Sequence, residues 1–278
     1  MRNKAERFRE LHAEGIFIMP CAWDACSAKL FAASGFSAVG TTSGGVNWSA
    51  GRPDYIYSVP REEMLDSYGL IAQAVDLPVS GDLENGYGPT PDHVAETIRA
   101  AINRGMVGGS IEDQTPSAGP ELFSLGDAVE RVAAARAAAD QSGIDFVLTA
   151  RAESYFGAAE APFNDAVRRA NAYVEAGADC VFIPGPADIE TISSLVTQID
   201  APLSVGIGTG GGSLSIEQLA DVGVRRVSTG GAVPRLLSNA LLQAASEMIE
   251  HGSFRFTNAA ISDIALENLL TDLQPPVV

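Results

Sequence analysis

Basic residues are scarce in this chain of 278 residues, which carries 18 Lys and Arg against 35 Asp and Glu, a formal charge of −17. A surface this acidic repels phosphate backbones and anionic lipids, so we expect no nucleic-acid partner and no membrane partner. No stretch approaches the ~20 apolar residues of a membrane span. The start of the chain, residues 1–7, is charged and has no apolar core of signal-peptide length. These absences predict a soluble, cytoplasmic protein.

Cysteine and histidine are also rare, with three residues of each type. The cysteines are Cys21, Cys26 and Cys180, and the histidines are His12, His93 and His251. The cysteines make no disulfide framework, and their spacing is not that of metal ligands. None of the histidines lies at the end of a predicted strand. We therefore expect neither a Ser-His-Asp triad nor histidine general-base chemistry.

Apolar segments of strand length alternate with helical segments along the whole chain. Strands are expected at residues 17–19, 38–42, 77–84, 107–112, 146–151, 180–183, 202–207 and 226–229. A helix follows each strand, and the last helix, residues 233–249, is long. Units of about 25 to 35 residues without a linker favour a parallel barrel over an open doubly wound sheet, and such barrels take about 250 residues.

We therefore predict an α/β protein with one (β/α)8 TIM-barrel domain that covers residues 1–278. Residues 1–15 contribute a leading helix, and residues 254–278 form a C-terminal helical extension. A polar loop is expected after the second strand, from residue 47 to residue 58.

Acidic side chains follow several strands at the end where such barrels place their active sites. Asp82 and Glu84 alternate at the end of the third strand, so both would point to one side if the strand continues through them. Asp54 lies in the loop after the second strand, and Glu112 ends the fourth. Each acid alone also fits a solvated strand end. Together they predict a Mg²⁺ site, with Mn²⁺ as an alternative, in which Asp82 binds directly and the other three hold the ion partly through water.

An anion-binding group accompanies these acids, because Arg151 ends the fifth strand and can clasp a carboxylate with its planar fork. The amides of Gly44 and Gly45, with the Ser43 hydroxyl, are placed to donate hydrogen bonds to an enolate oxygen. Tyr87 is a candidate acid or base, although an aromatic turn residue explains it equally well. The predicted catalytic residues are Tyr87, Arg151 and Glu112, and the predicted substrate-binding residues are Ser43, Gly44, Gly45, Asp82 and Arg151. Such a site would stabilise a pyruvate-like enolate.

Several of these segments are motifs of a known family. They are Trp-Asp-Ala-Cys-Ser-Ala at 23–28, Ser-Gly at 43–44, Pro-Asp at 53–54, Asp-Leu-Glu-Asn-Gly-Tyr-Gly at 82–88, Ile-Glu-Asp at 111–113 and Ala-Arg at 150–151. In this order they resemble the isocitrate lyase/phosphoenolpyruvate mutase superfamily, with Glu84 in place of the second Asp of the family's metal motif. The resemblance implies Mg²⁺, an enolate intermediate, and cleavage or formation of a C–C or P–C bond. It also implies a homotetramer, a dimer of dimers that exchange their last barrel helix.

The loop after the fourth strand departs from the family. Isocitrate and methylisocitrate lyases carry a Lys-Lys/Arg-Cys-Gly-His segment there, and phosphonate-handling members use a lysine and an asparagine. Residues 114–123 read Gln-Thr-Pro-Ser-Ala-Gly-Pro-Glu-Leu-Phe and contain none of these residues. The first hypothesis is a Mg²⁺-dependent lyase that cleaves a C–C bond in a small 2-oxo or 2-hydroxy (di)carboxylate. The alternatives are a P–C bond enzyme, such as a phosphonopyruvate hydrolase or mutase, and a non-catalytic protein that binds 2-oxo acids.

Overall fold

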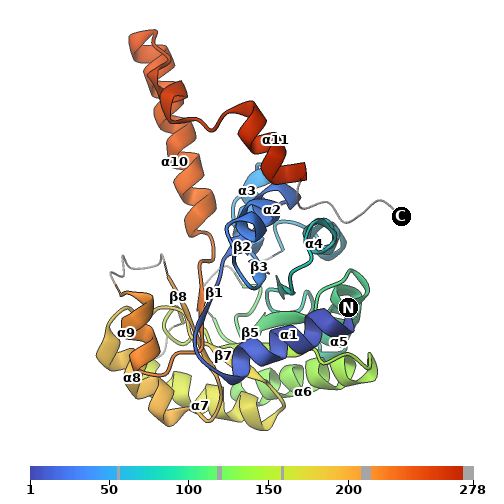
Figure 1. The fold of residues 1–278 in the computed structure, drawn as a ribbon. Coiled ribbons are helices and arrows are strands. Elements are labelled where there is room, and N and C mark those ends of the chain that lie inside the picture. The colour runs from blue at the N-terminus through green and yellow to red at the C-terminus, as the bar shows by residue number, and fades with distance from the viewer. Residues whose placement is uncertain (55–56, 118–120, 158–159, 208–213, 272–278) are drawn as a thin grey trace.

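Parallel strands arranged in a ring form the centre of the computed structural model, which describes residues 1–54, 57–117, 121–157, 160–207 and 214–271 (Figure 1). The strands are β1 (Phe17–Met19), β2 (Cys21–Ala22), β3 (Val39–Thr41), β4 (Val79–Asp82), β5 (Gly108–Glu112), β6 (Val147–Arg151), β7 (Cys180–Phe182), β8 (Leu203–Gly206) and β9 (Arg226–Ser228). Their order in the sheet is β1-β9-β8-β7-β6-β5-β4-β3-β2. Because the two ends of this order are consecutive in the chain, the sheet closes into the predicted (β/α)8 barrel, which is thereby confirmed.

The first strand of the barrel is split in two at Pro20. On one side of the break, β1 pairs with β9, and on the other side β2 pairs with β3. The Pro20 carbonyl still accepts a hydrogen bond from the N–H of Gly40, at 2.8 Å. Proline has no N–H to donate to the ladder, so the strand is interrupted where it changes partners.

Helices cover the outside of the barrel (Figure 1). They are α1 (Arg2–Ala13), α2 (Ala25–Ala33), α3 (Ser43–Ser49), α4 (Arg61–Ala74), α5 (Pro91–Asn103), α6 (Leu125–Gln141), α7 (Pro162–Glu175), α8 (Ile189–Gln198), α9 (Ile216–Asp221), α10 (Ala232–Ser246) and α11 (Asp263–Thr271). In α5, for example, Val94, Ile98 and Ile102 recur every four residues and are buried, as expected for one apolar face turned to the core. In the part of the chain that the structure describes, no helix combines the length and the apolar character needed to cross a bilayer.

The N-terminal end of the barrel is plugged by α1. The ring of His12 lies between the rings of Phe8 and Phe17, with centroid distances of 4.7 and 5.0 Å and edge-to-face geometry. A Cβ on Gly108 would lie 2.5 Å from Cε1 of Phe8, so a glycine is required where β5 begins. The aromatic plug closes this end and leaves the carboxyl ends of the strands for a site.

The segment after β3 is helical in its first half, which corrects the expectation of a polar loop from residue 47. Thr42 caps α3 by accepting a hydrogen bond from the N–H of Gly45, at 3.3 Å. A Cβ on Gly45 would lie 2.7 Å from Cβ of Trp23. Close packing between helix and Trp23 therefore requires a glycine, although glycine itself disfavours a helix.

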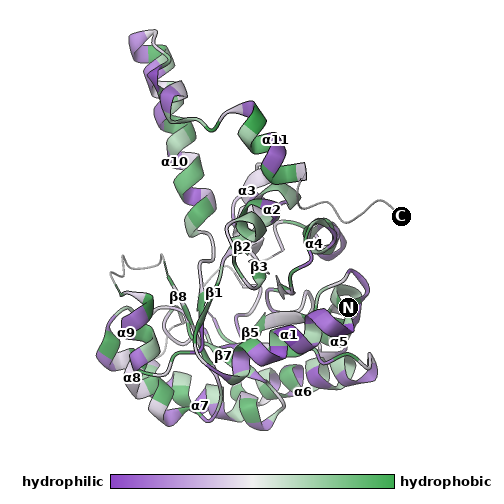
Figure 2. Cartoon of the chain, in the orientation of Figure 1, coloured by the Kyte–Doolittle hydropathy of each residue, from purple (hydrophilic) through white to green (hydrophobic). Residues whose placement is uncertain are grey.

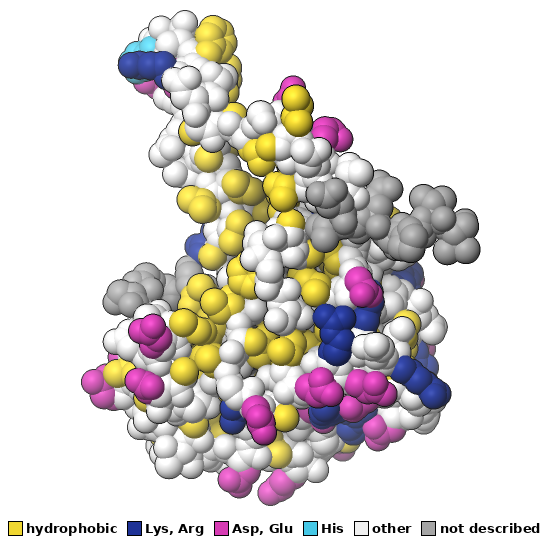
Figure 3. Space-filling view, in the orientation of Figure 1, with side chains coloured by type: hydrophobic (Ala, Val, Ile, Leu, Met, Phe, Trp, Pro, Cys, Tyr) yellow, Lys and Arg dark blue, Asp and Glu magenta, His cyan; other side chains and the backbone are white. Residues whose placement is uncertain are grey.

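The C-terminal helices form an arm that leaves the barrel, with α10 projecting outward and α11 returning beside α2 (Figure 1). The return is fixed by Lys29, whose Nζ donates to the Leu270 carbonyl at 2.9 Å. The large apolar side chains exposed on α10 are Leu236, Leu237, Leu241 and Leu242, which are 51 to 70% exposed. Apolar residues run along the arm in Figure 2 and gather on its visible face in Figure 3. Residues 272–278 of the predicted extension lie outside the described residues.

His12 provides a test of how deeply the barrel floor is buried. The residue is 5% exposed, and its Nε2 lies 3.3 Å from Nη1 of Arg226. Burial, reinforced by the charge of Arg226, lowers the pKa of His12 from 6.5 to about 3. Between these pH values the unfolded chain binds a proton that the native state excludes. The free energy of unfolding should therefore fall as the pH falls from about 6.5, by up to about 1.4 kcal/mol per pH unit.

Urea unfolding at pH 7.5, 6 and 5 should show a shallower decline for His12→Gln than for the wild type. His251→Gln, at an exposed position on the arm, serves as the control and should retain the wild-type slope. Equal slopes for His12→Gln and the wild type would contradict a buried, neutral His12.

Candidate active site

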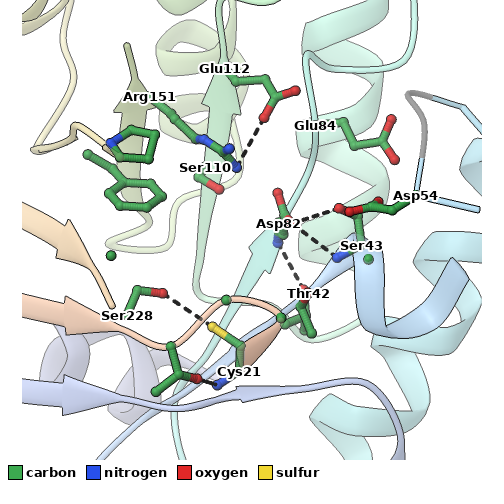
Figure 4. Close-up of a pocket in the computed structure, with 18 of the residues that line it drawn as sticks. Cys21, Thr42, Ser43, Asp54, Asp82, Glu84, Ser110, Glu112, Arg151 and Ser228 are labelled. Atoms are coloured by element: carbon green, nitrogen blue, oxygen red, sulfur yellow. Dashed lines mark hydrogen bonds and ion pairs between the residues drawn. The ribbon is translucent and has the colours of Figure 1, made fainter. Parts of the chain in front are cut away.

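A cavity of about 1130 Å³ opens at the carboxyl ends of the strands (Figure 4). The predicted site residues on its wall are Ser43, Gly44, Asp54, Asp82, Glu84, Glu112 and Arg151. They come from the ends of β4, β5 and β6 and from the segments after β3 and β4. Two further predicted residues, Gly45 and Tyr87, are not part of the wall. The barrel thus gathers the acids and the arginine around one space, as their strand-end positions indicate.

Asp82 is the most firmly held of these acids. Its Oδ2 accepts hydrogen bonds from the N–H and the hydroxyl of Ser43, at 3.0 and 2.9 Å, and its own N–H donates to Oγ1 of Thr41 at 2.9 Å. No partner of Oδ1 is found among the described residues. Both donors of Ser43 are therefore engaged with Asp82, and the predicted hydrogen bond from Ser43 to an enolate stays a prediction.

Asp54 reaches the same space because Gly44 leaves room for it. A Cβ on Gly44 would lie only 2.7 Å from Oδ2 of Asp54. The other oxygen, Oδ1, accepts a hydrogen bond from Nδ2 of Asn47 at 3.0 Å. Burial raises the pKa of Asp54, the hydrogen bond from Asn47 lowers it, and the charge of Asp82 adds to the rise. Burial and Asp82 thus disfavour the carboxylate form of Asp54, which the hydrogen bond from Asn47 and the charge of Arg151 stabilise.

Glu84 lines the cavity, but it lies in a turn and not on the strand that the sequence predicts. The strand ends at Asp82, and Glu84 has a left-handed backbone with φ 48°, so strand alternation does not align the two acids. Its Oε2 accepts a hydrogen bond from the N–H of Tyr57 at 3.0 Å. Burial raises the pKa of Glu84 from 4.5 to about 7, and the nearby charge of Asp82 contributes to the rise.

Arg151 lies between two buried acids. Its Nη1 is 3.2 Å from Oε2 of Glu112, its neighbour across β5 and β6, and its Nε contacts Glu153. The guanidinium carbon is 5.3 Å from the centroid of the Phe182 ring. Burial raises the pKa of Glu112 well above its usual range, and Arg151 opposes this rise. Glu153, which the predicted site did not include, therefore helps to fix the arginine fork.

The donor set suits a hard divalent cation. Among the described residues, five carboxylates and three guanidinium groups line the cavity, a formal excess of two negative charges. All the acidic donors are oxygens, the ligands that Mg²⁺ prefers. No three of these acids form a compact ligand cluster within the described ranges. The arrangement therefore fits an ion that keeps most of its water, and binding of Mg²⁺ itself stays a prediction.

Tyr87 is placed outside the cavity wall. Its ring stacks on that of Tyr57, with centroids 5.3 Å apart and an angle of 26° between the planes. Burial raises the pKa of the Tyr87 phenol, and the charge of Glu84 adds to the rise. A neutral phenol away from the cavity wall is poorly suited to act as a base, and the role of Tyr87 as an acid stays a prediction.

The cavity floor contains groups that the predicted site lacked. Sγ of Cys21 lies 3.2 Å from Oγ of Ser228, and the N–H of Cys21 donates to Oγ1 of Thr229 at 2.9 Å. Ser110 and Arg226 also line the floor. Strand alternation could have indicated two of these residues from the sequence. Ser228 lies in the last predicted strand, two residues after Arg226, so both side chains face the same side of the sheet.

A sequence model of the phosphoenolpyruvate phosphomutase family matches residues 8–249. The chain belongs to this family. The match confirms the resemblance to the isocitrate lyase/phosphoenolpyruvate mutase superfamily, whose members are lyases or mutases.

Individual relatives agree with this assignment. A Burkholderia cenocepacia protein of known structure, provisionally assigned as a lyase or mutase, is 44% identical, with coverage of 97% of this chain and 96% of that chain and a TM-score of 0.93. An uncharacterised protein of Mycobacterium tuberculosis is 34% identical over 230 residues, 82% of each chain. The 2-methylisocitrate lyase of Halalkalibacterium halodurans is 31% identical over 209 residues, 73% of this chain and 67% of that enzyme.

Removal of the Arg151 charge tests the electrostatic balance of the site. Arg151→Met leaves Glu112 and Glu153 buried without their cation, so the free energy of unfolding should fall by about 3–5 kcal/mol at pH 8. The loss should be smaller at pH 5, because protonation neutralises both acids in the native state. Urea unfolding at the two pH values measures both effects.

Arg168→Met is the matched control, since Arg168 is 62% exposed in its ion pair with Asp165. It should cost less than about 1 kcal/mol at either pH. Equal losses for the two variants would show that Arg151 does not neutralise buried charge.

Proposed function

We propose that this protein is a Mg²⁺-dependent lyase that cleaves a C–C bond in a small 2-oxo or 2-hydroxy (di)carboxylate through a pyruvate-type enolate. One observation carries the proposal: the fixed carboxylate of Asp82 and the guanidinium of Arg151 line the same cavity. The first can hold a cation, and the second can hold a substrate carboxylate. The similarity to a 2-methylisocitrate lyase supports a lyase reaction.

The roles follow from the charges. Asp82 would bind Mg²⁺ directly, and Asp54, Glu84 and Glu112 would hold its water ligands. The bound ion would supply a Lewis acid for the substrate oxygens. Arg151 orients the substrate carboxylate, because Glu112 and Glu153 hold its fork in place. Glu112 contributes to the reaction through this ion pair, whereas Glu84, whose pKa burial raises to about 7, can carry a proton near neutral pH.

Cleavage of a P–C bond is the second candidate, and the match to the phosphomutase family favours it. The absence of lysine and asparagine from residues 114–123 argues against it. A protein that binds 2-oxo acids without reaction is the third candidate, since the same loop also lacks the lyase cysteine. Measurements of C–C cleavage, of P–C cleavage and of 2-oxo-acid binding separate the three candidates.

The lyase proposal predicts metal-dependent turnover. The protein is stripped with a chelator, supplied again with Mg²⁺, and assayed against oxaloacetate, malate-type and methylmalate-type acids for release of pyruvate or glyoxylate. Asp82→Asn should lower turnover by at least about 100-fold, because it weakens the ligand proposed to bind Mg²⁺ directly. Asp92→Asn, at an exposed position in the first turn of α5, is the charge-matched control and should behave as the wild type.

Turnover that survives complete chelation would rule out the metal-dependent reaction. Release of phosphate from phosphonopyruvate would show that the protein is a P–C bond enzyme and not the proposed lyase. Calorimetric binding of a 2-oxo acid, without product from any compound, would identify the non-catalytic protein.

We also propose that the chain forms a homotetramer, a dimer of dimers that exchange their last barrel helix. The exposed leucines of α10 support it, because an apolar helix face of this extent is stabilised when it is covered. The arm holds this face away from its own barrel (Figure 1), where a second copy can reach it.

The assembly is tested by a charge on that face. Leu241→Glu with Leu242→Glu should convert the assembly to smaller species, measured by light scattering coupled to size-exclusion chromatography. Leu70→Glu is the control, since Leu70 is 62% exposed on α4 and is not part of the apolar face of α10. A wild-type protein that is monomeric at micromolar concentration would exclude the tetramer.

A further inference from the structure

A buried arginine lies at the floor of the cavity. Arg226, the first residue of β9, is 2% exposed and lines the cavity beneath the acids. Its Nε donates to Oγ of Ser204 at 2.9 Å, and its Nη1 donates to Oγ1 of Thr149 at 3.1 Å. The guanidinium is therefore held by three strands, β6, β8 and β9, in one position inside the barrel.

This cation has no anion beside it. Within the described residues no carboxylate forms an ion pair with Arg226, although a buried charge is costly unless it is paired. Its third neighbour, Nε2 of His12 at 3.3 Å, belongs to a neutral ring and supplies no negative charge. Hydroxyls and an imidazole satisfy hydrogen bonds but leave the charge uncompensated.

The surroundings of Arg226 are also unusual for the interior of a barrel, which bulky branched side chains normally fill. Hydroxyl groups surround Arg226 instead: Ser204 is its register partner on β8, Thr149 on β6 accepts its hydrogen bond, and Ser80 and Ser110 lie on β4 and β5. Ser80 and Ser110 line the cavity with Arg226, and Ser228 lines it one level above. Figure 4 shows Ser110 and Ser228 on the cavity wall. Such a floor offers hydrogen-bond donors to a small anion.

We propose that Arg226, with the hydroxyls of Ser110 and Ser228, forms a second anion subsite that binds the distal carboxylate of a dicarboxylate. The other carboxylate lies at Arg151. The assignment of the first carboxylate to Arg151 rests on the proposed function. The subsite itself rests on the unpaired charge of Arg226. The subsite narrows the substrate class from 2-oxo and 2-hydroxy acids in general to dicarboxylates.

The spacing of the two arginines fits a short carbon chain. Thr149, which contacts Arg226, precedes Arg151 by two residues on β6. A strand rises about 3.3 Å per residue, so the two levels are ~7 Å apart. Arg151 and Arg226 also come from strands three places apart in the sheet, β6 and β9, at about 4.8 Å per strand, so the space between them is wider than this rise alone. An anion that reaches both arginines therefore needs a carbon chain between its two carboxylates.

Binding of two dianions of different length tests the subsite. Oxalate and malate both carry two negative charges, but only malate is long enough to reach both arginines. Their dissociation constants are measured by calorimetry with the full chain in excess Mg²⁺, for the wild type, Arg226→Gln and Arg225→Gln. Arg225 is the matched control, since it donates to the Gly15 carbonyl at the protein surface.

Arg226→Gln should raise the dissociation constant of malate at least 10-fold more than that of oxalate. Arg225→Gln should change neither constant. If Arg226→Gln weakens the binding of malate and oxalate equally, the cause is a general loss of positive charge or a distorted barrel. That result would contradict the subsite. Unchanged malate binding would overturn it as well. Ser110→Ala, which leaves Arg226 in place, provides the same comparison if Arg226→Gln does not fold, and should weaken malate alone by about 3- to 10-fold.

The lyase proposal can fail separately. If no acid is cleaved, the difference between malate and oxalate still measures the subsite. If a monocarboxylate is cleaved and malate does not bind, the subsite is wrong and the lyase remains.

Discussion

Negative charge gathered in a buried cavity is the constraint that the rest of the site depends on. Burial raises the pKa of Asp54, Glu84 and Glu112, and the charges of neighbouring acids add to the rise. The backbone around the cavity supplies the opposing donors. Ser43 donates twice to Asp82, and the left-handed turn after β4 brings Glu84 to the N–H of Tyr57. The shapes of these loops therefore follow from the need to stabilise carboxylates away from bulk water.

Much of the barrel could be predicted from the sequence, because local signals and tertiary packing agree there. The predicted strands 107–112 and 146–151 differ from β5 and β6 by one residue each, since the apolar runs there are both β-prone and buried. Polar residues at the ends of apolar strands also placed Asp82, Glu112 and Arg151 at one rim, because parallel strands of a barrel end together. The cytoplasmic location, the metal and the tetramer stay predictions.

Other features depend on contacts between distant residues and left no local signal. The Ser-Gly-Gly run after β3 is typical of a loop, and only its packing against Trp23 makes it the start of α3. Glu84 reaches the cavity through a turn that strand periodicity does not describe. Alternation assigns Arg226 to the same side as Ser228, but it cannot show that no carboxylate faces that arginine across the barrel. Such information lies in the arrangement of the strands around the axis.

The interruption of the first barrel strand at Pro20 bears on how the barrel is made during synthesis. Residues 17–22 emerge early, yet Ile18 must pair with Val227, more than two hundred positions later. Until the ribosome has released β9, one edge of the growing sheet stays unpaired. A break that separates the early partner, β3, from the late one allows β2 to join its neighbour at once while β1 waits. Proline in this edge also has no N–H to donate to a foreign strand, which makes the edge a poorer template for pairing.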